Sequence, residues 1–254
     1  MYTSFSVTSG KNVIRGEYTC PATAEKHACL ILGHGFTGNR NERLLVTISK
    51  KLLEKDICCV RFDYDGHGES DGATEDVTIE KEVQDLSAVL DYVKSLDFID
   101  QKKIYIGGHS VGGLTPLLLC EKRAKEIAGL VLISPALSLY HEFVMTLTGE
   151  RLLAMANGEP IDFGSFRLGR AIIDECCMIN AFETASKIHP RALLLHGKED
   201  LDTPAFNSVE LKRLWGDDAV LCLIPDADHC YMSSMATNMV AEKTAQWLSG
   251  ALSE

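Results

Sequence analysis

The sequence predicts an α/β fold in which a mostly parallel sheet is covered by helices on both faces. Short apolar segments alternate along the chain with segments whose apolar residues recur every three or four positions, as strands alternating with helices do. Several apolar segments, such as Ile127–Ile133, contain almost no polar residue. Strands of that composition are buried on both faces, which is typical of parallel sheets. A chain of 254 residues is long enough for one large core of this type.

The predicted elements follow from this pattern in order. The chain opens with a hairpin around the turn at residues 9–12, and glycines or helices separate the later strands. Predicted strands occupy Tyr2–Val7, Val13–Tyr18, Ala28–Leu32, Ile57–Phe62, Ile104–Ile106, Ile127–Ile133, Ala192–Leu195 and Ala219–Ile224. Predicted helices occupy about Leu44–Glu54, Thr78–Ser95, Ser110–Lys122 and Ser233–Leu248.

One stretch interrupts the alternation. Between residues 136 and 187 we predict no clean strand, although large apolar side chains are frequent there. We interpret residues 136–187 as a cap inserted after the sixth predicted strand, so that residues 1–135 and 188–254 form the core. The alternative is an ordinary helical crossover with additional turns.

The composition excludes several classes of partner. Lys and Arg total 25 and Asp and Glu total 36, which gives a net charge of −11. An acidic chain is repelled by nucleic acids and by anionic membrane surfaces, so we expect neither as a partner. No apolar segment approaches the roughly 18 residues of a membrane span, and no signal peptide is predicted.

The nine cysteines are interpreted as small buried hydrophobic residues in a reducing cytosol. They form neither a C-x-x-C pair nor a cluster at zinc spacing. These observations predict a cytoplasmic protein without a metal site.

The clearest chemical signal is Gly108-His109-Ser110-Val111-Gly112. A G-x-S-x-G match is weak by itself, but this one follows a predicted strand and begins a predicted helix, as a nucleophile elbow does. The glycines allow a tight turn that exposes the serine at the end of the strand. We therefore predict Ser110 as a nucleophile, with the backbone N–H of Val111 facing a developing oxyanion.

A serine nucleophile needs a base and an acid, and both candidates follow predicted strands. His229 follows the last strand and is better placed as a base than the other seven histidines. Asp200 and Asp202 compete as the acid, with Glu199 third, and we favour Asp200. The order Ser, Asp, His along the chain is that of α/β-hydrolases.

A second oxyanion donor is expected in the loop after an earlier strand. Gly35 and Phe36 follow the predicted strand Ala28–Leu32 directly. We predict that the N–H of Phe36 joins that of Val111 in an oxyanion hole. The alternative is a plain glycine turn.

Nearly the whole chain resembles the α/β-hydrolase superfamily. Three segments resemble the small bacterial cinnamoyl/feruloyl esterases: residues 34–41 (HGFTGNRN), 60–72 (VRFDYDGHGESDG) and 228–230 (DHC). The resemblance places the catalytic triad at Ser110, Asp200 and His229. It selects Asp200 because this residue lies in an H-G-x-x-D-x-x-x-P stretch that ends at Pro204. It also implies oxyanion donors at Phe36 and Val111.

This chain differs from those esterases at two points that bear on the substrate. Val111 stands where they usually carry Gln, and Tyr140 is the one tyrosine between residues 136 and 191, where their cap uses a tyrosine to meet the phenolic ring. We therefore predict a serine esterase that needs no metal and no organic cofactor and acts on a small-molecule ester, with cinnamoyl esters as one option. A peptidase, an amide hydrolase, a monoacylglycerol lipase or acyltransferase of the same fold, and a non-catalytic binding relative, are the alternatives. A homodimer would agree with the resemblance.

Overall fold

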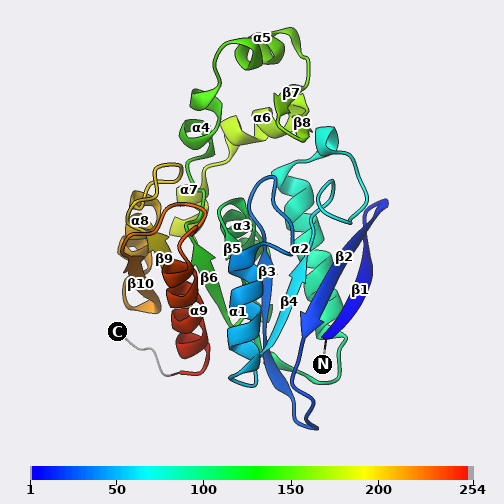
Figure 1. Ribbon diagram of the computed structural model, residues 1–254, viewed down its shortest axis with the longest axis vertical. Coiled ribbons are helices and arrows are strands. Elements are labelled where there is room, and N and C mark those ends of the chain that lie inside the picture. Colours follow the sequence, from blue (N-terminus) through cyan, green and yellow to red (C-terminus); the bar gives the residue numbers. More distant parts are fainter. Residues whose placement is uncertain (1, 251–254) are drawn as a thin grey trace.

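The computed structural model describes residues 2–250 and contains one eight-stranded sheet (Figure 1). The spatial order of the strands is β1 (Tyr2–Ser9), β2 (Asn12–Thr19), β4 (Cys58–Phe62), β3 (His27–Gly33), β5 (Ile99–His109), β6 (Gly129–Ile133), β9 (Ala192–Gly197) and β10 (Ala219–Ile224). The β1–β2 hairpin joins β4 in antiparallel fashion, and all pairs from β4 to β10 are parallel. The α/β class and the mostly parallel sheet are therefore confirmed.

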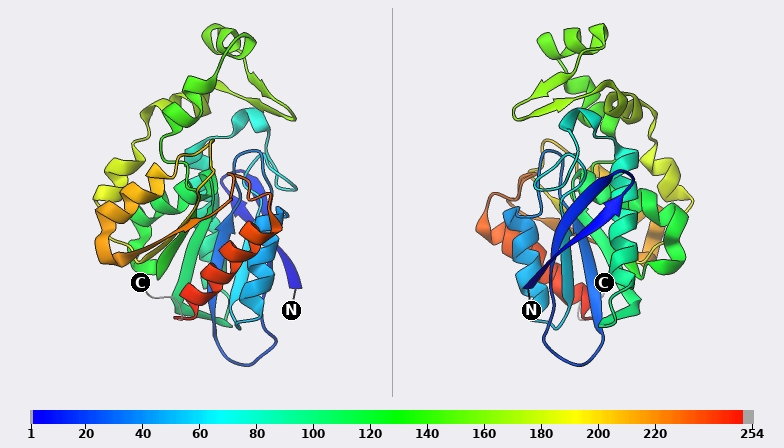
Figure 2. Two further views of the ribbon diagram at one scale, coloured as in Figure 1. Left: turned by 60° about the vertical axis from the view of Figure 1, so that its left-hand side comes forward. Right: turned by 90° about the vertical axis from the view of Figure 1, so that its right-hand side faces the viewer.

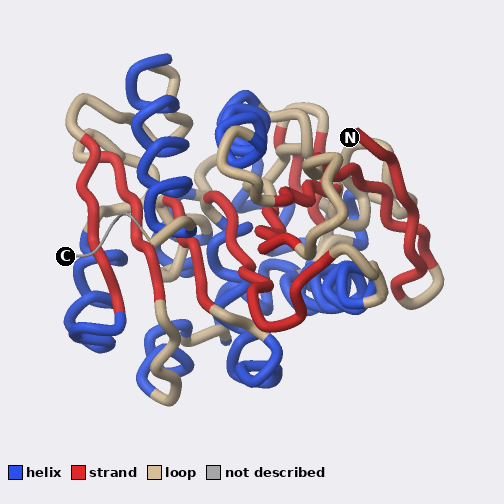
Figure 3. The backbone as a smooth tube through the Cα atoms, turned by 90° about the horizontal axis from the view of Figure 1, so that it is seen from below, coloured by secondary structure: helices blue, strands red, loops and turns tan. Residues whose placement is uncertain are grey.

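Helices cover both faces of the sheet, as the apolar strands require (Figure 3). One face packs against α1 (Arg43–Leu53) and α9 (Ser234–Leu248), which lie side by side. The other face packs against α2 (Ile79–Lys94), α3 (Val111–Arg123) and α8 (Phe206–Trp215). Because the strands are parallel, their carboxyl ends meet at one edge, and every site residue predicted above lies in a loop that leaves this edge or, for Val111, at the start of α3.

The segment between β6 and β9 extends above the carboxyl ends of the strands (Figures 1 and 2). It contains α4 (Leu139–Glu142), α5 (Glu150–Asn157), β7 (Ile161–Phe163), β8 (Phe166–Leu168), α6 (Arg170–Met178) and α7 (Ala181–Ser186). The expectation that this stretch has no strand is wrong, because β7 and β8 form a small antiparallel sheet. The boundaries of a cap domain at residues 136 and 187 stay a prediction.

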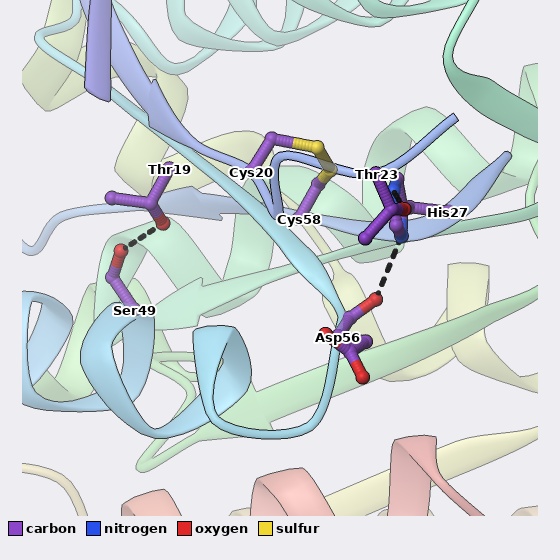
Figure 4. Close-up of a disulfide and its surroundings, with 7 residues drawn as sticks. All are labelled: Thr19, Cys20, Thr23, His27, Ser49, Asp56 and Cys58. Carbon is purple, nitrogen blue, oxygen red and sulfur yellow. Dashed lines mark hydrogen bonds between the residues drawn. A yellow bond between two sulfur atoms is a disulfide. The ribbon is translucent and has the colours of Figure 1, made fainter. Parts of the chain in front are cut away.

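Cys20 and Cys58 form a disulfide (Figure 4). The interpretation of all nine cysteines as unpaired buried residues is thus wrong for this pair. The physical reason is strand pairing: Thr19 and Cys59 are register partners in β2 and β4, which places Cys20 beside Cys58. Cys177 and Cys230 also differ from the expectation, because both are exposed.

No helix within residues 2–250 has the length and apolarity to cross a membrane. In the same residues, no group of three or more His, Cys, Asp or Glu side chains could hold a metal ion.

Candidate active site

Ser110 occupies a strained turn between β5 and α3. Its φ of 58° and ψ of −120° lie in a region that residues with a side chain rarely adopt. The turn is tied to the sheet because the N–H of Ser110 donates to the carbonyl of Ile133 over 2.9 Å. A methyl group on Gly112 would lie 2.4 Å from the carbonyl oxygen of His34, so only glycine fits there. The strand, the strained serine and the helix together form the elbow that the sequence predicts.

Strand register brings the predicted base and acid to the same place. Gly197 at the end of β9 and Ile224 at the end of β10 are register partners, so the loops that follow them begin side by side. His229 Nδ1 lies 2.8 Å from Asp200 Oδ2, and His229 Nε2 lies 2.9 Å from Ser110 Oγ. A carboxylate only accepts hydrogen bonds, so Nδ1 carries the proton and Nε2 can accept from the serine hydroxyl.

The surroundings of Asp200 favour its ionised form. Burial acts to raise the pKa of this carboxyl, but hydrogen bonds from His196, His229 and the N–H of Thr203 outweigh it and hold the pKa well below its ordinary value. The N–H groups of Thr203 and Asp202 both donate to Oδ1, at 2.8 and 3.1 Å. Asp202 therefore contributes its backbone to the orientation of Asp200, and its own carboxyl does not take the acid position.

The carboxylate of Asp200 also changes the pKa of His229. Burial alone would lower the pKa of His229, but the hydrogen bond and the negative charge of Asp200 raise it above its ordinary value, with smaller contributions from Asp202 and Glu142. An imidazolium at this position is thus stabilised, as a general base requires after it takes a proton.

The side chain of His109 contacts the backbone and the ring of His229. Its Nε2 lies 2.8 Å from the backbone carbonyl oxygen of His229, and the two rings lie 4.8 Å apart. Burial is the main reason that the pKa of His109 falls to about 3, so the ring is neutral and donates this bond from Nε2. This bond fixes the backbone of His229, the candidate base.

The predicted oxyanion loop passes directly beside the serine. The N–H of Gly38 donates to the carbonyl of Gly35 over 3.0 Å, which closes a tight turn with Phe36 and Thr37 at its corners. A methyl group on Gly35 would lie 3.2 Å from Ser110 Cβ, which shows how closely the two backbones approach. Phe36 and Val111 both line the cavity that Ser110 lines. The N–H of Val111 belongs to the first turn of α3, where helix N–H groups have no partner in the helix.

A cavity of about 690 Å³ lies over the serine and reaches under the segment between β6 and β9. Part of its wall is apolar and includes Ile79, Val111, Leu139, Phe143, Ile172 and Cys176. Four residues of the wall carry carboxyl or guanidinium side chains: Glu42, Arg43, Glu142 and Asp202. Glu42 and Arg43 were not predicted as site residues, because the sequence signal there is only that they follow the H-G-F-T-G turn.

Two of these carboxyls lie in places that oppose their ionisation. Burial raises the pKa of Glu42 to about 7, against smaller opposing contributions from the backbone of Asn39 and from His229. Burial also raises the pKa of Glu142, which accepts a hydrogen bond from Asn207 Nδ2 over 2.6 Å.

The sheet order, the helices on both faces and the strand–serine–helix turn define the protein as an α/β-hydrolase. The family model described as "Serine aminopeptidase, S33" matches residues 24–158, which is just over half of the chain. The chain therefore belongs to this family of hydrolases.

Solved structures agree with this assignment and with the resemblance seen in the sequence. Est1E from Butyrivibrio proteoclasticus, with ferulic acid bound, superimposes with a TM-score of 0.83 and 28% identity over 95% of this chain and 98% of that chain. Mouse alpha/beta hydrolase domain-containing protein 10 has the same fold, with a TM-score of 0.79, 18% identity and coverage of 98% and 100%.

Curated relatives match over shorter parts. An uncharacterized 31.7 kDa protein of Escherichia coli is 35% identical over 88 residues, which are 35% of this chain and 30% of that protein. The human palmitoyl-protein thioesterase ABHD10 is 25% identical over 195 residues, which are 71% of this chain and 62% of the relative. The matched region thus spans less than two thirds of these relatives' lengths.

Proposed function

We propose that the protein is a serine hydrolase that cleaves carboxylic esters through an acyl-enzyme. One observation carries the proposal: a strained serine, a histidine and a carboxylate form an unbroken hydrogen-bonded chain at the wall of a cavity. A serine hydroxyl needs a paired base of this kind to act as a nucleophile. The fold by itself is compatible with many reactions, so the argument rests on the site.

The geometry gives each residue a role in this proposal. Ser110 Oγ attacks the ester carbonyl while His229 Nε2 takes its proton, and Asp200 stabilises the resulting imidazolium. The N–H groups of Phe36 and Val111 hold the negative oxygen of the tetrahedral intermediate. His229 then gives its proton to the leaving alcohol, and later activates the water that releases the acid and restores Ser110.

Replacing the nucleophile tests this proposal. We expect Ser110→Ala to lower kcat for a short p-nitrophenyl ester by at least about 10³-fold. A fluorophosphonate should label the native protein and not the variant, which separates a reactive serine from that of a non-catalytic binding relative. Turnover by Ser110→Ala close to that of the native protein would refute the assignment.

We propose an apolar acyl group, with cinnamoyl-type acids as one class. The support is the apolar wall of the cavity and its aromatic side chains, since the rings of Phe36 and Phe143 lie 5.6 Å apart at this wall. Apolar walls with a few polar groups are typical of small-molecule sites. Methyl ferulate, short acyl esters and monoacylglycerol, assayed side by side, would rank these acyl groups.

Amide and thioester substrates are the second candidates. The family description favours a peptidase and the ABHD10 relative favours a thioesterase. Aminoacyl anilides and acyl thioesters in the same panel distinguish these reactions from ester hydrolysis.

We retain the cytoplasm as the proposed location, and the Cys20–Cys58 disulfide provides its test. Disulfides persist mainly in oxidising compartments. In a reducing cytosol, alkylation of the freshly isolated protein in denaturant without reductant should modify all nine cysteines, whereas a persistent disulfide leaves seven.

A further inference from the structure

The direction of proton transfer divides the cavity into two sides. His229 must give its proton to the leaving alcohol, so this half of an ester lies against His229. Cys230 and Met232 follow His229 in the same loop and also line the cavity. Arg43 belongs to this side as well, because its Nη2 donates to the carbonyl oxygens of Tyr231 and Met232 at 2.7 and 2.5 Å. The acyl half then points to the apolar wall.

The side that receives the leaving group carries an excess of carboxylates. Glu42 precedes Arg43 and lies against the oxyanion loop, where a methyl group on Gly38 would come within 1.8 Å of its Oε1. Asp202, in the loop that holds Asp200, also lines the cavity, and its charge acts on Cys230 as that of Glu42 does. Glu142 of α4 lines the cavity as well, and its charge acts on His229. Arg43 is the one cation among the described residues that line this cavity.

The charges of these carboxylates act on two neighbouring side chains, Cys230 and His229. Burial is the first reason that the pKa of the Cys230 thiol is raised, and the charges of Asp228, Asp202, Glu42 and Asp200 raise it further. The charge of Glu42 and that of His229 also act on each other. Fixed charges of one sign that line a cleft raise the local concentration of ligands of the opposite sign.

We propose that this site selects the leaving group by charge, preferring an alcohol that carries a cationic group over a neutral one, and a neutral one over an anionic one. Glu42 and Asp202 hold the cationic group beside His229, while the apolar wall holds the acyl chain. The inference rests on the proposed ester hydrolysis and adds to it the chemical class of the alcohol.

Three butyrate esters that differ in the charge of the alcohol test this preference. The cationic choline ester is compared with its neutral carbon isostere, the 3,3-dimethylbutyl ester, and with the anionic 2-sulfoethyl ester. The assay is run at pH 8, where a carboxyl with a pKa of about 7 is mostly ionised. We expect kcat/KM to fall by about fivefold at each step, since one charge pair about 4 Å apart in water is worth about that factor. Raising the salt concentration should reduce these ratios.

Three variants locate the effect. Glu42→Gln and Asp202→Asn should each reduce the ratio of choline to dimethylbutyl ester by about three- to fivefold. Asp217→Asn removes the same charge at the opposite edge of the sheet, before β10 begins, and should leave the ratio unchanged. Asp202 lies on an exposed loop, so its variant keeps the test valid if Glu42→Gln fails to fold.

The outcomes separate the two proposals. Equal rates for the three esters, or a preference for the sulfoethyl ester, overturn charge selection while ester hydrolysis stands. The expected order without a response to either variant overturns the assignment to Glu42 and Asp202. A native protein that hydrolyses none of these esters and no p-nitrophenyl ester refutes the proposed function, and the inference with it.

Discussion

Asp200 and Asp202 are close in sequence, but only the carboxyl of Asp200 contacts His229. The sequence left Asp200 and Asp202 as competitors, and the resemblance favoured the first. In the structure Asp200 is buried and accepts from His229 and from two backbone N–H groups, whereas Asp202 is exposed. The difference arises from the turn after β9, which no composition rule describes.

The pairing of Asp200 with His229 predicts a change in pH dependence. In the proposed mechanism His229 must be neutral to take the serine proton, so activity is lost as pH falls through its pKa, which Asp200 raises above the ordinary 6.5. We expect the acid limb of kcat/KM in the native enzyme to have a midpoint above 6.5. Asp200→Asn should move this midpoint to lower pH and reduce kcat by about 10³- to 10⁴-fold.

The control for this variant is Asp226→Asn on the neighbouring loop. Asp226 is exposed and has a φ of 51°, which asparagine also tolerates. It should keep the native pH profile, measured with a p-nitrophenyl ester between pH 5 and 9. An unchanged acid limb in Asp200→Asn would contradict the proposed coupling.

At the scale of elements, the core strands could be predicted well and the cap elements could not. The strands of the parallel sheet are apolar on both faces, so composition alone reveals them. Residues 161–168 did contain a hairpin signal, because apolar and polar residues alternate around Gly164-Ser165. We missed it because each strand has only three residues. The α8 helix was not predicted either, because two of its four buried residues, Asn207 and Ser208, are polar and weaken the apolar periodicity.

The three residues of the candidate triad could be predicted because the strands that precede them could be predicted. Ser110, Asp200 and His229 follow strands that the sequence reveals, so their convergence follows from the parallel topology. The charged side of the cavity was not predictable in this way. Glu42 and Arg43 lie at the start of α1, and their relation to His229 depends on how two loops from distant strands pack.

The junction between β5 and α3 gives the element-scale prediction. A methyl group at position 112 would lie 2.4 and 2.5 Å from the carbonyl oxygens of His34 and Gly33. Backbone cannot yield as a flexible side chain does, so we expect Gly112→Ala to cost at least about 2 kcal/mol of stability. For a chain of this length, that lowers Tm by about 4–8 °C.

Calorimetry of Gly112→Ala beside Gly10→Asn provides the comparison. Gly10 has a φ of 56° in the β1–β2 turn with open space around it, and asparagine adopts such angles at little cost. Gly10→Asn should therefore melt close to the native protein. A Gly112→Ala variant with native Tm and native activity would show that the elbow tolerates a side chain there.

At the scale of the whole molecule, three of the buried histidines near the carboxyl edge of the sheet, His34, His67 and His109, have lowered pKa values. Burial is the main reason that the pKa values of His34 and His109 fall to about 3 and that the pKa of His67 is lowered. The rings of His34 and His67 lie 4.9 Å apart, and His67 also packs against Phe166 of β8. The contact joins the core to the segment above it through a ring that is neutral in the folded state.

These histidines predict a loss of stability in mild acid. In the unfolded chain these histidines take up protons as pH falls below about 6.5. In the folded state His34 and His109 do not do so until about pH 3, and the pKa of His67 is also lowered. The free energy of unfolding therefore decreases as pH falls below about 6.5. His34 and His109 each cost up to about 2–3 kcal/mol by pH 4.5. Urea unfolding at pH 7 and 4.5 measures the decrease.

Two variants test the contribution of His67. His67→Phe keeps a ring against Phe166 and removes one titrating group, so between pH 7 and 4.5 it should lose less stability than the native protein. His141→Gln, on the exposed face of α4, should lose as much as the native protein. If His67→Phe loses as much as the native protein, acid sensitivity arises from groups other than His67.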